Sequence, residues 1–354
     1  MKILTVVGNR PQFIKAAAVS GQLRERHEEV LVHTGQHYDD SLSGVFFSEL
    51  GLARPDRELG LGGGSNESQT ARMRAALEPL LEEIRPDAVL IYGDTNSTLA
   101  GAKAGEHAQI PVVHVEAGMR SFDSTMPEEL NRIATDWVSE LLLCSSEVAR
   151  ENLTHEGVPG KAVVVGDVMV DVAMRLQPLA RADDVSQRTH GVKPGEYLLL
   201  TAHRAGNVDD PDRLRALVEL VKALQQPIVF PVHPRTHARL EDAGLWQELE
   251  QIDGLRLTEP LGYVEFSALL CMAKTVVTDS GGVQKEAYLA GVPCVTLRAN
   301  TEWVETVTSG WNTLVDLDVQ AALAALELQA PREHPALYGD GHAAERCVEA
   351  IETL

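Results

Sequence analysis

The chain has 354 residues, of which 44% are hydrophobic and only 5% aromatic, and its formal net charge at pH 7 is −21. The length favours two domains, and the composition is that of a globular protein whose core is filled mainly by aliphatic side chains. This acidic balance disfavours a nucleic-acid groove or an anionic membrane surface as a partner, although a local pocket can still bind a small anion.

Four cysteines stand far apart along the chain, and no C-x-x-C pair occurs. We expect them to be reduced, buried thiols of a cytoplasmic protein rather than zinc ligands. The N-terminal sequence MKILTVVGNRPQ has an apolar run that is too short for a signal peptide, so it is predicted to be a first strand. No apolar run reaches the ~20 residues that a membrane-spanning helix needs.

Short apolar segments alternate with longer amphipathic segments in the first half of the chain. The predicted strands are residues 3–7, 29–33, 88–92, 112–115 and 141–144. The predicted helices are about 12–26, 65–84, 97–108, 127–138 and 147–156. Continuous Val-, Ile- and Leu-rich strands separated by helices are typical of a parallel sheet that is covered on both faces.

The same alternation resumes after Gly191. The predicted strands are residues 197–201, 228–232, 255–257, 275–278 and 294–297, with helices at about 210–225, 236–250, 264–272, 283–290 and 302–309. We therefore predict an α/β fold with two doubly wound, Rossmann-like domains, residues 1–167 and 168–339, and a cleft between the domains.

In such sheets ligands bind beyond the carboxyl ends of the strands, so a site residue should follow a strand directly. Arg10 and Lys15 follow the first predicted strand in GNRPQFIK, where two cations beside a helix N-terminus suit an anion. Asp94 and Glu116 follow two later strands, and neighbouring carboxylates suit one acid and one base. Solvated cations, a helix cap at Asp94 and an ion pair between Glu116 and Arg120 are the ordinary structural interpretations.

A further polar segment, MPEELNR, opens a predicted helix. Glu128 and Arg132 are four residues apart and therefore share a face of this helix. From spacing alone, a helix-surface ion pair is the favoured interpretation.

Polar segments also follow strands in the second half. His203 and Arg204 follow one strand, His233 the next and Arg298 a later one. These residue types suit proton transfer and phosphate binding, whereas capping histidines and a surface ion pair are the ordinary structural interpretations.

The most specific segment is TDSGGVQKEA, where a strand ends, a Ser-Gly-Gly turn follows and a helix begins. Backbone N–H groups at Ser280, Gly281 and Gly282 can bind a diphosphate, and Glu286 can accept from ribose hydroxyls. A tight capped turn without a ligand would have the same sequence. The G-x-G-x-x-G fingerprint is absent, which argues against a nicotinamide cofactor, and no cluster of metal ligands is predicted.

Taken in order, these motifs resemble the non-hydrolysing bacterial UDP-N-acetylglucosamine 2-epimerases. The segments that carry the resemblance run from residue 8 to about 305: GNRPQFIK, HTGQH, YGDTNSTLAGA, VEAGMRSF, MPEELNR, TAHR, VHP, GYVEF, TDSGGVQKEA and LRANTEWVE. The resemblance implies a two-domain GT-B fold, a homodimer and a C-terminal helix, residues 340–354, that joins the first domain. It also implies reversible conversion of UDP-GlcNAc to UDP-ManNAc by anti elimination of UDP through 2-acetamidoglucal and re-addition, without a metal or other cofactor.

The resemblance also assigns roles to individual residues. The implied catalytic residues are the carboxylates Asp94, Glu116 and Glu128, with His203 near the diphosphate. The implied substrate contacts are Arg10, Lys15, Arg132, Phe266, Ser280, Gly281, Gly282, Glu286 and Arg298. Many bacterial members bind a second UDP-GlcNAc as an activator, at positions that match Gln36, His37, Arg72, Arg204 and His233.

The sequence departs from the family pattern in two places. Gly206 stands where members often have Glu in H-R-x-E-N, and VHPRT and TEWVE differ from the commonest forms. These segments resemble a branch that contains 2-epimerases of UDP-2,3-diacetamido-2,3-dideoxyglucuronate, which makes that sugar nucleotide the second candidate substrate.

Three different functions would use a similar fold and diphosphate seat: a GT-B glycosyltransferase, a hydrolysing epimerase and a catalytically silent UDP-sugar sensor. A glycosyltransferase would need an acceptor, and a hydrolysing epimerase would release free ManNAc. The presence of all three carboxylates, Asp94, Glu116 and Glu128, argues against the silent sensor.

Overall fold

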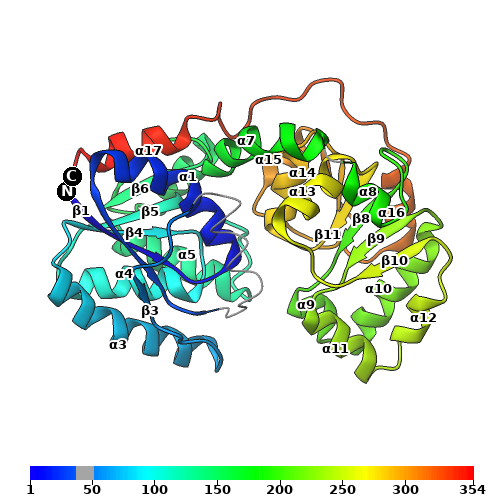
Figure 1. Cartoon of the computed structure of the whole chain (residues 1–354), viewed down its shortest axis with the longest axis horizontal. Helices are drawn as coiled ribbons and strands as arrows, with labels where there is room; N and C mark the ends of the chain where they lie inside the picture. The colour runs from blue at the N-terminus through cyan, green and yellow to red at the C-terminus, as the bar shows by residue number, and fades with distance from the viewer. Residues whose placement is uncertain (37–51, 183) are drawn as a thin grey trace. The chain divides into compact units, whose positions relative to one another are not determined.

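The computed structural model describes residues 1–36, 52–182 and 184–354, except for the side chain of Arg10. The chain divides into two compact units, each drawn in Figure 1: unit 1 contains Met1–Met174 and Ala336–Leu354, and unit 2 contains Arg175–Pro335. Each unit has a parallel sheet with helices around it, which confirms the predicted α/β class with two doubly wound sheets. Within the described ranges, no helix is long and apolar enough to cross a membrane.

In the described part of unit 1, a parallel sheet of seven strands has the order β3-β2-β1-β4-β5-β6-β7. The strands are β1 Lys2–Val7, β2 Glu28–His33, β3 Arg57–Glu58, β4 Ala88–Tyr92, β5 Val112–Ala117, β6 Leu141–Cys144 and β7 Lys161–Val164. The helices are α1 Arg10–Arg26, α3 Asn66–Ile84, α4 Asn96–Ala108, α5 Pro127–Val138, α6 Glu147–Glu156, α7 Val168–Ala182 and α17 Ala343–Ile351. The strand order reverses direction between β1 and β4, and ligands of doubly wound sheets bind at such a point.

In unit 2, the described residues form a parallel sheet of six strands in the order β10-β9-β8-β11-β12-β13. The strands are β8 Leu198–Thr201, β9 Ile228–Pro231, β10 Leu255–Thr258, β11 Thr275–Thr278, β12 Cys294–Thr296 and β13 Asn312–Leu314. The helices are α8 Val185–Thr189, α9 Ala205–Val208, α10 Pro211–Leu224, α11 Pro234–Asp242, α12 Trp246–Glu250, α13 Tyr263–Cys271, α14 Gly281–Leu289, α15 Val304–Thr308 and α16 Val319–Leu326. Here the order reverses between β8 and β11.

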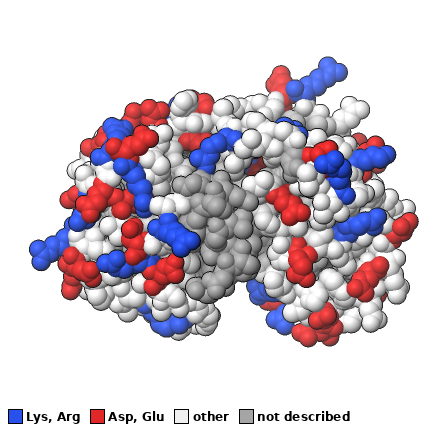
Figure 2. All heavy atoms as spheres, in the orientation of Figure 1, with Lys and Arg blue, Asp and Glu red and all other residues white. Residues whose placement is uncertain are grey.

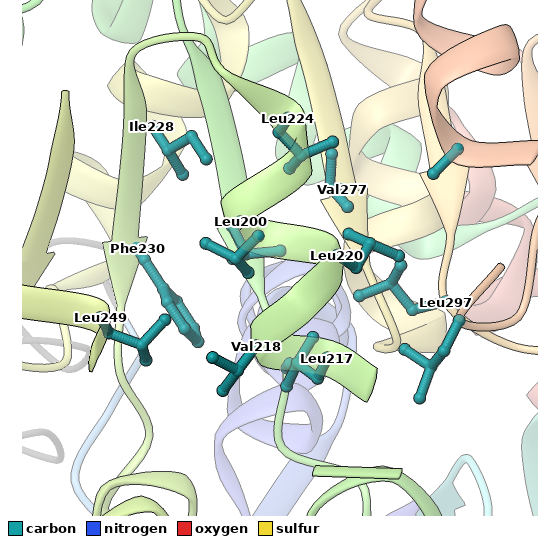
Figure 3. Packing of buried hydrophobic residues seen from close by; sticks show 14 of the residues in the cluster. Leu200, Leu217, Val218, Leu220, Leu224, Ile228, Phe230, Leu249, Val277 and Leu297 are labelled. Atoms are coloured by element: carbon teal, nitrogen blue, oxygen red, sulfur yellow. The ribbon is translucent and has the colours of Figure 1, made fainter. Parts of the chain in front are cut away.

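Apolar packing against α10 forms a large part of the core of unit 2. The labelled side chains of Figure 3 belong to this cluster, and each is at most 3% exposed: Leu200, Leu217, Val218, Leu220, Leu224, Ile228, Phe230, Leu249, Val277 and Leu297. Asp210 caps α10 by accepting from Asp212 N at 2.9 Å and Arg213 N at 3.1 Å, and Pro211 occupies the first turn. The cap and the apolar face together explain why a helix begins here.

Three edge strands, the helices α8, α9 and α16, and one helix break differ from the predicted elements. β3, β7 and β13 lie at sheet edges and are short, and their largely exposed or half-buried residues do not form the apolar runs that identify a central strand. The predicted helix 236–250 is divided into α11 and α12, because Gly244 adopts a positive φ of 68° between them.

All four cysteines are free and buried, as expected from their spacing. Burial raises the pKa of Cys144 and Cys294 to about 12 and that of Cys271 to about 11. The thiolate form, which is the reactive one, is therefore scarce at neutral pH.

Both signs of charge are interspersed on the visible face of each unit, as Figure 2 shows. The net charge of −21 is thus carried by an excess of carboxylates spread among cations. A large net charge of this kind affects solubility and the choice of partners rather than the fold.

The C-terminal helix α17 belongs to unit 1 and packs against α1. Its first N–H groups are capped from another helix: the Asp171 carboxylate on α7 accepts from Ala343 N at 3.1 Å and from Ala344 N at 2.7 Å. Burial raises the pKa of Asp171, and the two N–H donors oppose this shift. A second link joins Asp167 N to Tyr338 O at 2.7 Å, so α17 is fixed at its start.

Replacing Asp171 with Ala should lower the free energy of unfolding by about 1–2 kcal/mol, because the N–H groups at the start of α17 lose their acceptor. Urea unfolding followed by circular dichroism measures this change. Glu82→Ala is the matched control, since Glu82 is exposed on α3 and should change the same free energy by less than about 0.5 kcal/mol. Equal effects of both substitutions would contradict the capping role.

Candidate active site

The turn after β1 is held in contact with the end of β4. Asn9 caps α1 by accepting from Gln12 N at 3.3 Å, and Gly8 N donates to Gln12 Oε1 at 2.7 Å. Gln12 Nε2 in turn donates to Tyr92 O at 2.8 Å. A Cβ atom on Gly8 would overlap the Ser97 hydroxyl, so this turn requires glycine. The result is a rigid start for α1, the helix that carries Lys15.

Lys15 forms an ion pair with Glu116, and only about a tenth of either side chain is exposed. Glu116 lies near the end of β5 in the left-handed region, with φ 70°, a conformation that is costly for a residue other than glycine. The pair lies beside Gly93, where a Cβ atom would be 3.1 Å from Lys15 Nζ and 3.5 Å from Glu116 Oε2. An ion pair between Glu116 and Arg120 is one interpretation of the sequence. In the structure Arg120 instead pairs with Glu156 and Asp136.

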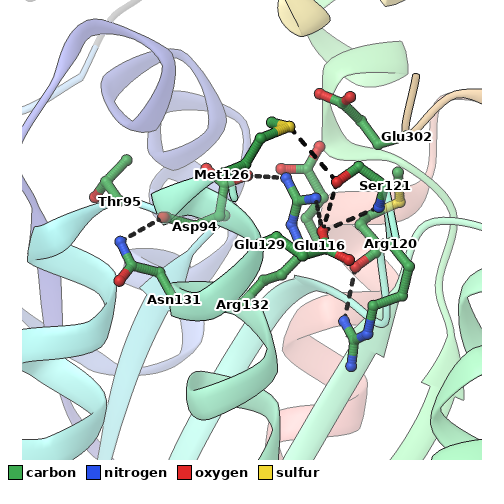
Figure 4. Close-up of polar contacts among 12 residues, drawn as sticks. Asp94, Thr95, Glu116, Arg120, Ser121, Met126, Glu129, Asn131, Arg132 and Glu302 are labelled. Carbon is green, nitrogen blue, oxygen red and sulfur yellow. Dashed lines mark hydrogen bonds and ion pairs between the residues drawn. The ribbon is translucent and has the colours of Figure 1, made fainter. Parts of the chain in front are cut away.

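Asp94 lies next to this pair, directly after Gly93, and is bound from α5. Arg132 forms an ion pair with Asp94 and a second one with Glu129 at 2.6 Å, and the Arg132 side chain is 4% exposed. Asn131 Nδ2 donates to Asp94 O at 3.1 Å. Figure 4 shows Asp94, Glu116 and Arg132 in one close group. The structure therefore brings together the predicted residues Lys15, Asp94, Glu116 and Arg132.

Of the two glutamates that open α5, Glu129 is the buried one. It is 2% exposed and accepts from Ser121 N at 3.0 Å, Ser121 Oγ at 2.9 Å and Phe122 N at 2.9 Å. Glu128 lies in the first turn of the same helix and is not buried. Glu129 thus orients Arg132 and the preceding loop, whereas Glu128 is the more accessible of the two carboxylates.

A second group of predicted residues lies at the switch point of unit 2 and is organised by Asp279. This carboxylate is fully buried and accepts from His203 N at 3.0 Å, Arg204 N at 3.0 Å and Asn207 Nδ2 at 3.2 Å. The His203 ring stacks on His233, with centroids 5.4 Å apart and planes inclined by 29°. Asp279 therefore ties the end of β11 to the end of β8 and positions the backbone of His203.

Arg298 and Arg204 share one carboxylate in unit 2. Arg298 Nη1 lies 2.9 Å from Glu302 Oε2, and Arg204 Nη2 lies 3.8 Å from Glu302 Oε1. Burial lowers the pKa of Arg298, and the charge of Glu302 opposes this effect. The Asp279 carboxylate also acts on Arg298, and guanidinium groups placed in this way can donate charge-assisted hydrogen bonds to an anion.

The N-terminus of α14 adjoins Glu302. The Ser280 side chain makes no capping bond, and a Cβ atom on Gly281 would overlap the Glu302 carboxylate. Gly282 is exposed, and a Cβ there would meet no atom closer than 4.0 Å. Glu286 is half-buried on the same helix. The backbone N–H groups at this helix start are well suited to hold a phosphate group.

Of the other predicted residues, Gln36 lies next to the first group, because it binds Ser97, whose hydroxyl adjoins Gly8. Phe266 is 8% exposed and packs in an apolar cluster along α13. Gln36 Oε1 accepts from Ser97 N at 3.0 Å and from Ser97 Oγ at 2.7 Å, and Arg72 donates to carbonyl groups of the loop before α3. The Arg10 side chain and His37 lie outside the described residues.

Sequence reasoning did not single out several residues that organise the two groups: His114, Glu129, Asp136, Asp279 and Glu302. Asp279 directly follows β11, so the strand-end rule alone could have identified it. His114 and Asp136 lie inside a strand and a helix, where no local pattern distinguishes them from other polar residues. Among the described residues, no group of three or more His, Cys, Asp or Glu side chains could hold a metal ion.

Comparison with known proteins gives consistent matches over the whole chain. A family model described as UDP-N-acetylglucosamine 2-epimerase matches residues 21–352. The chain is 44% identical to the UDP-N-acetylglucosamine 2-epimerase homolog of Methanococcus maripaludis and 45% identical to the UDP-2,3-diacetamido-2,3-dideoxy-D-glucuronate 2-epimerase of Pseudomonas aeruginosa; each alignment covers 100% of both chains. A crystal structure of the Methanocaldococcus jannaschii UDP-GlcNAc 2-epimerase in complex with UDP-GlcNAc and UDP superposes with a TM-score of 0.94 at 38% identity, again covering both chains fully.

Replacing Asp279 with Ala should lower the free energy of unfolding by about 2 kcal/mol or more, because several donors at the end of β8 lose their acceptor. Urea unfolding measures the change, and faster amide exchange at His203 and Arg204 would locate it. Asp253→Ala is the control, since Asp253 is exposed in the same unit and should shift the value by less than about 0.5 kcal/mol. Unchanged exchange at both amides would show that Asp279 does not hold this turn.

Proposed function

Because the chain belongs to the UDP-N-acetylglucosamine 2-epimerase family and is a non-hydrolysing UDP-sugar 2-epimerase, we propose that its substrate pair is UDP-GlcNAc and UDP-ManNAc. The observation that carries the proposal is the pair of carboxylates Asp94 and Glu116 at neighbouring strand ends, each held by its own cation. The resemblance to the M. jannaschii enzyme, whose crystal structure contains UDP-GlcNAc and UDP, supports the choice of sugar.

The chemistry requires more than a base. The C2 proton of the sugar is not adjacent to a carbonyl group, so its removal must be coupled to departure of UDP from C1. One carboxylate takes the C2 proton, the C1–O bond breaks with its electron pair going to UDP, and 2-acetamidoglucal remains. UDP then adds back to C1 while a proton is delivered to the opposite face of C2. Asp94, Glu116 and Glu128 are the proposed proton carriers.

Departing UDP needs stabilisation of its new negative charge. In unit 2, Arg298, the Ser280 hydroxyl and the N–H groups at Gly281 and Gly282 are the proposed diphosphate seat, with His203 beside it. The Ser280 N–H is not part of this seat, because it donates to Thr278 Oγ1 at 2.9 Å. Asp279 fixes the backbone of His203 and Glu302 binds Arg298 before the reaction, and preorganised donors stabilise a developing anion without reorganisation. Glu286, partway along α14, is the proposed acceptor for the ribose hydroxyls.

A second substrate is favoured by one specific observation. The P. aeruginosa relative that is 45% identical over its full length acts on UDP-2,3-diacetamido-2,3-dideoxy-D-glucuronate, according to its name. The same elimination and re-addition would serve that sugar, which differs at C3 and C6 rather than at the reacting C2. We therefore keep it as the second candidate substrate for direct comparison.

Proton NMR in deuterium oxide tests the proposal. Incubation with UDP-GlcNAc alone should remove the H2 signal and produce UDP-ManNAc, because the proton returned to C2 comes from solvent. Conversion of only the diacetamido-glucuronate sugar would transfer the proposal to that substrate. Release of free ManNAc would indicate a hydrolysing enzyme, and turnover that requires an added acceptor would indicate a glycosyltransferase.

The variants Asp94→Asn and Glu116→Gln should each lower kcat by about 100-fold or more in this assay, since each removes a proton carrier while keeping the side-chain shape. Their affinity for UDP should stay within about threefold of wild type, as the proposed nucleotide seat lies in unit 2. Glu82→Ala, on the exposed face of α3, is the control for general effects. Full activity in both carboxamide variants would remove these residues from the mechanism.

The variant Glu286→Ala should raise the Kd for UDP about tenfold, because loss of one charge-assisted hydrogen bond costs roughly 1.5 kcal/mol. Isothermal titration calorimetry with UDP measures this change, and Asp253→Ala serves as the control on the surface of the same unit. An unchanged Kd would contradict the assignment of Glu286 to the ribose.

A further inference from the structure

A buried hydrogen-bond network lies behind the two turns that carry Asp94 and Glu116. His114, within β5, and Asp136, within α5, are both fully buried. His114 Nδ1 lies 2.7 Å from Asp136 Oδ1, and His114 Nε2 lies 2.7 Å from Gly93 O. The ring therefore bridges the end of β4 and the helix α5.

The hydrogen atoms of this bridge can be assigned from chemistry alone. A carbonyl oxygen only accepts, so His114 Nε2 carries a hydrogen and donates it to Gly93 O. A second hydrogen lies between His114 Nδ1 and the Asp136 carboxylate, since two acceptors would repel at 2.7 Å. The bond to Gly93 O is thus locked by the bond to Asp136, and Gly93 is the residue directly before Asp94.

The other oxygen of Asp136 holds the second turn. Asp136 Oδ2 accepts from Gly118 N at 3.2 Å and from Arg120 Nη1 at 2.8 Å. Gly118 follows closely after Glu116, and both have positive φ, 79° and 70°. A backbone bent in this way needs support from its surroundings, and the bond from Gly118 N supplies it.

The buried charge of Asp136 is balanced locally. Arg120 donates to Asp136 and, through Nε and Nη2, to both oxygens of Glu156 at 2.7 and 2.6 Å. Burial acts to lower the pKa of Arg120, but its bonds to Glu156 and the charge of Asp136 raise it. The buried Asp136 carboxylate therefore has several hydrogen-bond partners and is not an isolated polar group.

We propose that Asp136 and His114 are positioning residues for the epimerase reaction, which fix the turn of Asp94 against the turn of Glu116 through Gly93 O and Gly118 N. The inference rests on the proposed function. Proton removal from one face of C2 and return to the other require both carboxylates at set positions. Both positioning residues are fully buried, so each acts through the backbone alone, and a misplacement of ~1 Å can cost about 100-fold in rate.

Asp136→Asn and Asp136→Ala separate position from charge. In Asp136→Asn, the amide N–H can donate to Nδ1 of a neutral His114, Nε2 still donates to Gly93 O, and the amide oxygen still accepts from Gly118 N. We expect kcat within about fivefold of wild type, with an unchanged pH profile. In Asp136→Ala these bonds are lost, and we expect kcat to fall about 30-fold or more with KM changed less than about threefold.

A second pair of variants keeps the test decisive if Asp136→Ala does not fold. The amide of a glutamine can occupy the place of His114 Nε2 and donate to Gly93 O, whereas an asparagine reaches only the place of Nδ1. His114→Gln should therefore retain at least about ten times the kcat of His114→Asn, while both show similar thermal stability because each leaves one ring bond unmade. Equal activities, or the reverse order, would overturn the proposal.

All variants are compared with wild type by H2 exchange in deuterium oxide and by UDP titration calorimetry. Absence of exchange in the wild type would contradict the proposed function itself. If the wild type is active, two results would overturn the inference: a kcat of Asp136→Asn as low as that of Asp136→Ala, or a shifted pH profile of Asp136→Asn. Either result would show that the charge or proton of Asp136 matters rather than its position. Unchanged UDP affinity with the expected order of kcat values would support it.

Discussion

A buried peptide group at the end of a parallel strand must find a hydrogen-bond partner. This requirement organises the carboxyl ends of the strands in both sheets. In unit 1, Gln12 joins Gly8 N to Tyr92 O, and His114 binds Gly93 O. In unit 2, Asp279 accepts from the N–H groups of the turn after β8. In each case a buried side chain from one strand, or from the segment after it, binds the backbone at the end of a neighbouring strand.

This arrangement places each proposed reactive side chain next to a backbone that is held in position. Asp94 follows Gly93, Glu116 lies just before Gly118, and His203 follows β8, so each lies close to a fixed peptide. Side chains whose backbone is fixed in this way lose little entropy when they meet a substrate, and catalysis depends on such preorganisation. Tight glycine positions at Gly8 and Gly93 follow from the same close approach of strand ends.

The chain carries a net charge of −21, yet cations lie among the proposed site residues. Lys15, Arg132 and Arg298 are each largely buried and each paired with a carboxylate. Pairing with a carboxylate reduces the free-energy cost of removing a cation from water. Cations can therefore remain buried at a site that is proposed to bind an anion. The net charge of the whole chain therefore affects solubility, whereas the charges within the proposed site affect ligand binding.

The sequence by itself determined the alternation of strands and helices, the α/β class and the positions of Asp94, Glu116 and His203 at strand ends. These features depend on local periodicity and on which residue follows an apolar run, both of which are readable without neighbours in space. Only the tertiary structure decided that Lys15 pairs with Glu116 and that His114 and Asp136 lie behind the carboxylate turns. Those pairings join residues far apart in the chain through the strand order of the sheet and the packing of helices on it. No spacing rule contains that information, because which strands become neighbours is settled by the burial of whole faces.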